Sequence, residues 1–309
     1  MFKLFNMKQM KMKQTLVIGS TVIDVLLNLP VLPRRGEDIN LTAQEYRVGG
    51  CAYNVYKTLK LLKSQALLCS PVGTGVYGRM VREHFEKEGI QTFVSLEEEN
   101  GCCYCLIEPD GERSFLSLHG AEYLFSPFWM KNIDFSLFDA VFICGLEVEE
   151  AAGKELIDFV YEHPGFELYF APGPRIKQIP AERMERLLER RDKNQKGPFL
   201  HLNEKEALSF SNKNTVEEGA EFLAGKTGNS VVITLGQRGS YCLSKPGAAG
   251  LYISGFPVKA LDTVGAGDAH CGALIACLKE GMDLTEACRT ANKIGAETVK
   301  SKGERRVNI

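Results

Sequence analysis

The chain has 309 residues, of which 44% are hydrophobic and 25% are charged, and its formal net charge is −2. These proportions are ordinary for a soluble globular protein, and the length suits one large α/β domain with an appendage, or two domains. Because positive charge is not in excess, the composition gives no reason to expect a nucleic acid or an anionic membrane as a partner.

The N-terminal segment, residues 1–14, is basic but lacks the apolar run of a signal peptide. No stretch of the chain has the length and hydrophobicity of a transmembrane helix. We therefore expect a cytoplasmic protein with a single folded domain over residues 15–309, preceded by an extension without fixed structure.

The ten cysteines include a close group, Cys102, Cys103 and Cys105. Adjacent residues of a strand point to opposite faces, so Cys102 and Cys103 are not expected to share a metal ion. We expect reduced thiols that act as small hydrophobic side chains, and no zinc site.

The first elements in chain order are a buried strand at Thr15–Ser20 and a helix at residues 51–64, whose apolar residues recur at helical spacing. A second buried strand is predicted at 66–73, followed by an amphipathic helix at 77–90 that Gly89 closes. Further strand patterns lie within 139–145, 166–175, 199–203 and 230–244, with helical patterns at 149–165 and from Asn203 onward.

This alternation of strands and helices indicates right-handed βαβ units and a mostly parallel sheet. Two segments, residues 25–47 and 101–119, do not fit the alternation and have the pattern of exposed antiparallel β structure. We predict a doubly wound α/β body flanked by helices, with a small discontinuous β-sheet lid formed by these two segments.

The most informative stretch is LDTVGAGDAHCGAL, which begins at Leu261. Gly265, Ala266 and Gly267 permit a tight turn into a helix predicted from about Asp268 to Leu278, whose first amide groups favour a phosphoryl group. An aspartate there would repel an anion, so Asp268 is better explained as a base that takes a proton from an attacking hydroxyl. The structural alternative is that Asp268 only caps the helix.

Two motifs suit a nucleotide and its metal ion. Asn203 and Glu206 lie three residues apart at a helix start, where they would hold Mg²⁺ through water; a capping box explains the same pair equally well. The segment from Thr234 to Gly239 ends a β-branched run, and its turn would approach a nucleotide phosphate or form a plain hairpin.

A third group suits a hydroxyl-rich substrate. Asp24 follows the first strand, and Gly49, Gly50 and Asn54 stand at the start of the next helix. Short polar groups on a glycine turn fit polyol hydroxyls, although helix capping is the alternative explanation.

A competing motif is GTGVYG, Gly73–Gly78, which matches the dinucleotide fingerprint of dehydrogenases and has Glu97 and Glu98 about twenty residues later. It belongs to the second βα unit, where the fingerprint normally occupies the first, and it leaves the Asp262–Asp268 stretch unexplained. We therefore favour the phosphoryl-transfer interpretation.

At these residues the sequence resembles the PfkB/ribokinase family of carbohydrate and nucleoside kinases. DTVGAGDAHCGAL resembles the C-terminal signature of that family, YRVGGCAYNVYKTLKLL its Gly-Gly motif, LNEKEA its Asn-x-x-Glu motif, and TLGQRGSY its Thr-x-Gly-x-x-Gly segment. The resemblance runs in order from about Thr15 to Gly303, and it is greatest to a subgroup of sugar kinases without an assigned substrate.

The resemblance implies an ATP-dependent kinase with Asp268 as the catalytic base and the backbone amides of Gly265 to Asp268 as an anion hole. It implies substrate contacts from Asp24, Gly50, Asn54 and Asp262, with Gly49 in the same turn. It also implies Mg²⁺ near Asn203 and Glu206, ATP along Thr234, Gly236 and Gly239, and K⁺ near Asp262, Val264 and Gly303.

The lid of such relatives often forms a dimer contact, which implies a homodimer here. Arg113 in the lid hairpin is a further candidate, because its charge would reach substrate or phosphate on closure; a solvated turn residue is the alternative. Cys51 stands where ribokinase-like members carry lysine, which argues against ribose itself as the substrate. The alternatives to a sugar kinase are a nucleoside kinase of the same family and a sugar- or nucleoside-binding sensor that has lost turnover.

Overall fold

The computed structural model describes residues 13–189 and 196–300. The predictions for residues 1–12 and for Gly303 lie outside these ranges.

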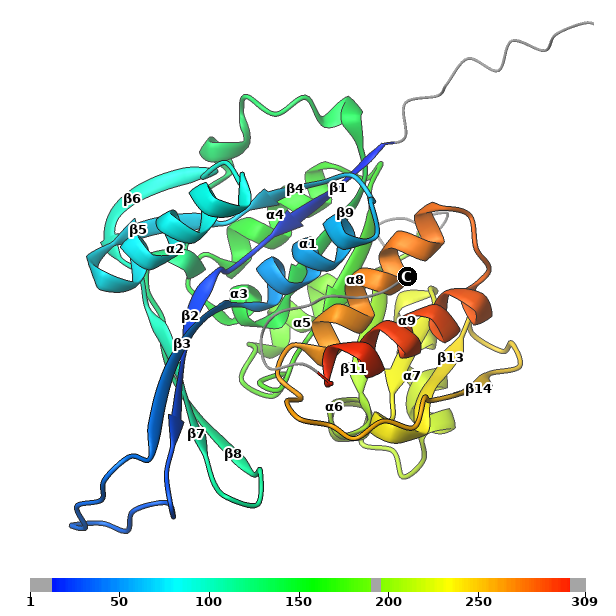
Figure 1. The fold of residues 1–309 in the computed structure, drawn as a ribbon. Coiled ribbons are helices and arrows are strands. Elements are labelled where there is room, and N and C mark those ends of the chain that lie inside the picture. Colours follow the sequence, from blue (N-terminus) through cyan, green and yellow to red (C-terminus); the bar gives the residue numbers. More distant parts are fainter. Residues whose placement is uncertain (1–12, 190–195, 301–309) are drawn as a thin grey trace, which may run out of the picture.

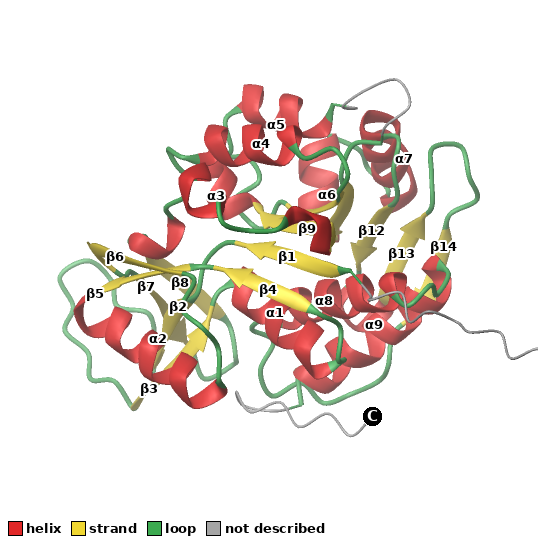
Figure 2. Cartoon of the chain, turned by 90° about the horizontal axis from the view of Figure 1, so that it is seen from above, coloured by secondary structure: helices red, strands yellow, loops and turns green. Residues whose placement is uncertain are grey.

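An eight-stranded sheet forms the centre of the molecule (Figures 1 and 2). Its strands are, in spatial order, β14 (Leu251–Ser254), β13 (Gly239–Leu243), β12 (Val231–Thr234), β11 (Phe199–Asn203), β10 (Glu167–Ala171), β9 (Phe138–Cys144), β1 (Gln14–Ile18) and β4 (Ala66–Cys69). The six strands from β12 to β4 pair in parallel, and β13 and β14 pair antiparallel at one edge. The predicted doubly wound, mostly parallel α/β fold is therefore confirmed.

Helices cover both faces of this sheet (Figure 2). One face packs against α1 (Cys51–Leu61), α8 (Ala266–Lys279) and α9 (Leu284–Thr298), and the other against α4 (Gly153–Glu162), α5 (Ala181–Leu188), α6 (Glu204–Ser211) and α7 (Val216–Thr227). The sequence of β1 is apolar because both faces of the strand are buried. Leu16 and Ile18 pack in the core on one face of the sheet, and Val17 packs in the core on the other.

A separate four-stranded sheet, here called the small sheet, has the order β3 (Ala43–Gly49), β2 (Val22–Asn28), β7 (Cys102–Ile107) and β8 (Arg113–Leu118). It extends from one side of the main sheet in Figure 1. The two segments set apart in the sequence thus form one sheet, as predicted. Both hairpins are antiparallel, but the β2–β7 pair that joins them is parallel, which the sequence did not indicate.

The predicted second strand, residues 66–73, is wrong in its extent. It divides at Ser70 into β4 in the main sheet and β5 (Pro71–Thr74), which pairs with β6 (Val94–Glu99) in a two-stranded sheet. The helix α2 (Gly75–Glu88) follows β5 and ends at Gly89, as expected. Because the fingerprint-like stretch Gly73–Gly78 lies outside the main sheet, it does not occupy the position that a dinucleotide fold requires.

The remaining elements are a short helix, α3 (Gly145–Glu149), and four 3₁₀ turns, η1 (Ala121–Tyr123), η2 (Pro127–Met130), η3 (Phe135–Leu137) and η4 (Gly236–Arg238). The helix predicted at 149–165 is α4, which begins four residues later than expected. Within the described ranges, every helix is too short or too polar to cross a membrane.

Candidate active site

The predicted site residues gather where parallel strands end and helices begin. Asn203 ends β11, Thr234 ends β12, and Gly50 and Gly265 precede α1 and α8. In open α/β sheets this edge is where ligands bind, because the strand order reverses there and opens a crevice.

Asp268 is the third residue of α8 and does not cap it. The N-cap is Gly265, whose φ of 71° is in the left-handed region and which supplies no side-chain cap. The capping alternative for Asp268 is therefore wrong. Its Oδ2 instead accepts a hydrogen bond of 2.9 Å from Asn54 Nδ2, which joins the start of α8 to α1.

The turn before α8 is stabilised by backbone hydrogen bonds. The Ala266 amide donates to the Thr263 carbonyl at 3.3 Å, and the Ala269 amide donates to the Gly265 carbonyl at 2.9 Å. The amides of Gly267 and Asp268 belong to the first turn, where an α-helix offers no partner of its own. These amides are the part of the predicted anion hole that the helix geometry favours.

Asp262 is held by two arginines of the small sheet. Arg47 Nη1 lies 2.6 Å from its Oδ2, and Arg113 Nη1 lies 3.0 Å from its Oδ1 and 3.1 Å from Thr263 Oγ1. The side chain of Arg113 is only 14% exposed, so the solvated-turn alternative for this residue is wrong. Arg47 was missed by the sequence analysis, because no local pattern links it to a residue so distant in the chain.

Asp262 also fixes the turn that follows it, since the Val264 amide donates to Asp262 Oδ1 at 2.9 Å. Its carboxylate is thus neutralised by two guanidinium groups and does not fit the role of a K⁺ ligand.

Asp24 lies on β2, opposite Arg47 of β3 and Cys103 of β7. Burial, together with the negative charges of Cys103 and Asp268, raises the pKa of its carboxyl to about 7, although Arg47 lowers it. Asp24 is therefore within electrostatic range of the base candidate, although no direct bond joins the two side chains.

Cys103 and Cys105 lie beside Asp24 on the same face of the small sheet, with their Sγ atoms 4.0 Å apart. The Cys105 thiol and the Ser117 hydroxyl lower the pKa of Cys103 to about 7 by hydrogen bonding. All ten cysteines of the chain are free thiols.

Asn203 and Glu206 form the capping box that was the alternative explanation for this pair. Asn203 Oδ1 accepts from the Glu206 amide at 2.9 Å, and Glu206 Oε2 accepts from the Asn203 amide at 2.9 Å. Burial raises the pKa of Glu206, the Asn203 amide lowers it, and the negative charge of Asp268 raises it. A divalent cation between Glu206 and Asp268 would relieve this repulsion, so the donor set fits Mg²⁺.

A cavity of about 390 Å³ lies between the end of β11, the β12–β13 turn, the start of α8 and the C-terminal half of α9. Asn203, Thr234, Gly236 and Gly239 all line it, as do Ala266 and Gly267, which precede Asp268. The volume is within the range of small-ligand pockets. The turn from Thr234 to Gly239 is also the hairpin of the alternative explanation, so the two interpretations are compatible.

Two further cavity residues, His270 and Asn292, were missed by the sequence analysis. Asn292 Nδ2 donates to the Ile253 and Ser254 carbonyls, which leaves Asn292 Oδ1 to accept from His270 Nε2 at 3.0 Å. His270 Nδ1 then accepts from His201 Nε2 at 2.9 Å. Burial lowers the pKa of His270 to about 4, so it is neutral at physiological pH and fixes the wall of the cavity.

Glu147, in α3 after β9, is a buried acid that was also missed. Its Oε1 accepts from the Ser20 amide at 2.8 Å, while its Oε2 has no hydrogen-bond partner within the described part of the chain. Burial raises its pKa to about 7. A hydrogen bond with Cys144 and burial raise the pKa of Cys51, after the glycine pair, and the charges of Asp268 and Glu147 raise it as well.

We expect Glu147→Gln to raise the free energy of unfolding above that of the wild type, and to raise it more at pH 8 than at pH 5. The pKa is about 4.5 in the unfolded chain and about 7 in the folded one, so the wild type loses stability as pH rises between these values. Glutamine removes that loss, which is at most about 3 kcal/mol, and keeps an acceptor for Ser20. Urea denaturation at both pH values measures it; an equal effect at pH 5 and pH 8 would contradict the buried-acid assignment.

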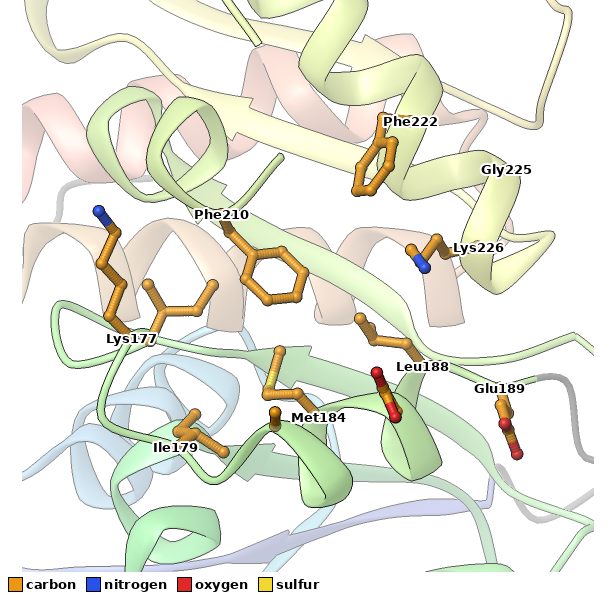
Figure 3. Close-up of a pocket in the computed structure, with 12 residues that line it drawn as sticks. Lys177, Ile179, Met184, Leu188, Glu189, Phe210, Phe222, Gly225 and Lys226 are labelled. Carbon is orange, nitrogen blue, oxygen red and sulfur yellow. The ribbon is translucent and has the colours of Figure 1, made fainter. Parts of the chain in front are cut away.

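A larger cavity, of about 910 Å³, lies on the other face of the main sheet and holds none of the predicted residues (Figure 3). Figure 3 shows that its lining side chains come largely from α5, α6 and α7, among them Met184, Phe210 and Phe222. Its polar side chains, Lys177, Glu185, Glu189 and Lys226, belong to none of the motifs described above, so size alone does not identify the site.

Comparison with known proteins identifies a family that matches nearly the whole chain. The model of the pfkB family carbohydrate kinases matches residues 12–308. The chain is 31% identical over 296 residues to the uncharacterized sugar kinase YegV of Escherichia coli, covering 94% of this chain and 90% of the relative.

Solved structures share the fold. The ribokinase of Arabidopsis thaliana, complexed with ribose and ATP, has a TM-score of 0.75 at 20% identity, with 94% of each chain covered. The nucleoside kinase of Burkholderia thailandensis, in complex with inosine, has a TM-score of 0.74 at 18% identity, with 94% of this chain and 90% of that chain covered. With the family model matching almost from end to end, the chain belongs to the pfkB family of carbohydrate kinases, and it is a phosphotransferase with the ribokinase-like fold.

Proposed function

We propose that the protein transfers the γ-phosphoryl group of ATP to a hydroxyl of a sugar or a related small molecule. One observation carries this proposal: the first turn of α8 links two separate sets of residues. Ala266 and Gly267 line the 390 Å³ cavity, and the next residue, Asp268, is hydrogen-bonded to Asn54 of the polyol-binding set. A base at this junction stands between a nucleotide and an acceptor.

In this mechanism ATP occupies the cavity along Asn203, Thr234, Gly236 and Gly239, with its phosphates directed toward the start of α8. The acceptor lies against Asp24, Gly50 and Asn54. The acceptor oxygen attacks the γ-phosphorus while its proton passes to Asp268, and the bond from the γ-phosphorus to the oxygen that bridges it to ADP breaks. The amides of Gly267 and Asp268 stabilise the charge on the transferring group.

Glu206 and Asn203 would hold Mg²⁺ through water, and this ion neutralises phosphate charge when bound. Asn54 orients the Asp268 carboxylate by donating to Oδ2. The support for sugar-like acceptors is the family itself, together with the ribose and inosine named for the two relatives above.

The small sheet acts in this proposal as a lid over the acceptor, in which Arg47 and Arg113 bind Asp262 in the closed position. Its edge strand β8 also exposes Leu116 and Leu118, which are 59% and 58% accessible. An exposed apolar edge strand favours pairing with another chain, so we propose a homodimer through this sheet.

We expect Arg113→Ala to raise the KM for the acceptor about fivefold and to change kcat little. The variant loses one partly buried ion pair of about 1 kcal/mol and leaves Arg47 in place, so closure is weakened but not abolished. Steady-state kinetics measure both constants, with Arg35→Ala, an exposed arginine between β2 and β3, as the control. Unchanged constants in Arg113→Ala would remove this residue from the closure mechanism.

The function itself is tested by ADP formation from ATP with Mg²⁺ and K⁺, over a panel of sugars, nucleosides and sugar phosphates. A sugar acceptor that is turned over supports the proposal, and a nucleoside acceptor would assign the chain to the nucleoside kinases of the family. ATP binding without any acceptor would favour a sensor, and failure to bind ATP would refute the proposed site.

A further inference from the structure

Three potential metal ligands lie together on the face of the small sheet that carries Arg47. They are the Asp24 carboxylate on β2 and the Cys103 and Cys105 thiols on β7. One ligand atom from each residue lies within 4.8 Å of the other two. The adjacent Cys102 points to the opposite face of β7 and takes no part in this cluster.

The pairing of the strands produces this cluster. β2 and β7 are parallel, and Asp24 is the register partner of Cys103. Cys105 is two residues farther along β7, so its side chain returns to the same face. The cluster thus depends on a strand pair that joins two distant segments of the chain.

The spacing matches a tetrahedral site for a thiophilic ion. Two sulfur atoms that bind one Zn²⁺, each at about 2.3 Å, are about 3.8 Å apart in tetrahedral geometry. The observed separation between Cys103 Sγ and Cys105 Sγ is 4.0 Å. Two thiolates with one carboxylate suit zinc or cadmium, whereas Mg²⁺ requires a shell of oxygen ligands.

The Asp24 carboxylate is available for such an ion. Within residues 13–189 and 196–300 it makes no hydrogen bond and no ion pair, although Arg47 is near enough to lower its pKa. Glycine at position 49 makes room for this carboxylate, because a Cβ atom there would lie 2.2 Å from Asp24 Oδ2. Three protein ligands leave a fourth position for water or a substrate oxygen.

We propose that Asp24, Cys103 and Cys105 form a binding site for a thiophilic divalent cation such as Zn²⁺, and that the bound ion competes with the acceptor. The second part rests on the proposed function, in which Asp24 contacts acceptor hydroxyls. An ion on Asp24 withdraws this carboxylate from the acceptor, so the metal-loaded kinase is inhibited and removal of the metal restores it. The site is distinct from the Mg²⁺ position at Asn203 and Glu206, since the donor sets differ.

The binding experiment uses the reduced, chelator-treated full chain without nucleotide or acceptor. Titration with Co²⁺ is expected to give a near-ultraviolet thiolate-to-cobalt absorption band that saturates at one equivalent and that Zn²⁺ abolishes. Protons should be released on binding, because ligand thiols must be ionised. Excess Mg²⁺ should leave the band unchanged.

Variants identify the ligands. Cys103→Ser and Cys105→Ser should each lose most of the cobalt band and bind Zn²⁺ more than about tenfold more weakly, since even loss of an outer partner costs 10–100-fold. Cys102→Ala is the matched control, because Cys102 is also on β7 and its side chain points to the opposite face. A wild type without the band, or a band that survives in both serine variants, would overturn the site.

A separate measurement tests the competition. With an acceptor that the kinase turns over, Zn²⁺ should raise the KM for that acceptor, a chelator should reverse this effect, and Cys103→Ser should be resistant. Metal binding without any change in KM would refute the competition and leave the site established. Failure of the kinase assay leaves the cobalt titration unaffected, so the two proposals can fail independently.

Discussion

Asp268→Asn is expected to lower kcat by about 10²–10⁴-fold, which is the usual contribution of a positioned general base. Asparagine keeps the shape of the side chain and an oxygen that accepts from Asn54 Nδ2, so the packing of α1 against α8 should persist. It has no carboxylate to take the acceptor proton. Steady-state turnover, together with ATP binding measured by calorimetry, separates a loss of chemistry from a loss of binding.

The matched control for this variant is Asp283→Asn. Asp283 is the N-cap of α9, where its side chain accepts from the Glu286 amide, and asparagine caps a helix as well as aspartate does. The same chemical change should therefore leave turnover near that of the wild type. Near-normal turnover in Asp268→Asn would remove this residue as the base, whatever the control does.

Gly50→Ala is expected to destabilise the protein by at least about 1–3 kcal/mol and to raise the KM for the acceptor. Gly50 has φ of 101° and ψ of 142°, a conformation that costs other residues about this much. A Cβ atom there would also lie 2.5 Å from the Ser20 carbonyl oxygen, which accepts from the Tyr53 amide. Relief of this contact would displace the start of α1, and with it Asn54.

The control is Gly281→Ala, in the loop after α8. Gly281 also has a positive φ, 84°, but a Cβ atom there would have no neighbour within 4 Å. It should show the conformational cost alone and leave the KM for the acceptor unchanged. Urea denaturation measures both variants, and equal losses of stability would mean that the contact with Ser20 does not matter.

Much of the fold could be predicted because its signals are local. The apolar runs of β1, β9, β11 and β12 are buried on both faces, so their sequence alone identifies them as strands of a parallel sheet. The glycine turn before α8 likewise specifies a helix start that favours an anion, wherever its partners lie. The prediction that β4 and β5 form a single strand failed because both are apolar, and only the pairing partner differs.

The ligand-facing details were harder to predict. The spacing of Asn203 and Glu206 predicts a capping box, but the sequence cannot show that Asn203 also lines a cavity or that Glu206 is close enough to Asp268 for its charge to raise the Glu206 pKa. Glu147 gives no signal in the sequence, because an acidic residue in a short helix is ordinarily solvated, and its hydrogen bond comes from the amide of Ser20 in the distant loop after β1.

The sequence by itself determined the alternation of strands and helices, the two segments that leave it, and the signature around Asp268, since each depends on residues close together in the chain. Only the tertiary structure decided that Arg47 and Arg113 bind Asp262, and that Asp24 meets Cys103 and Cys105. These contacts join residues far apart in sequence. Their geometry is set by the parallel β2–β7 pairing and by the position of the small sheet against the loop before α8, which no local pattern of residues specifies.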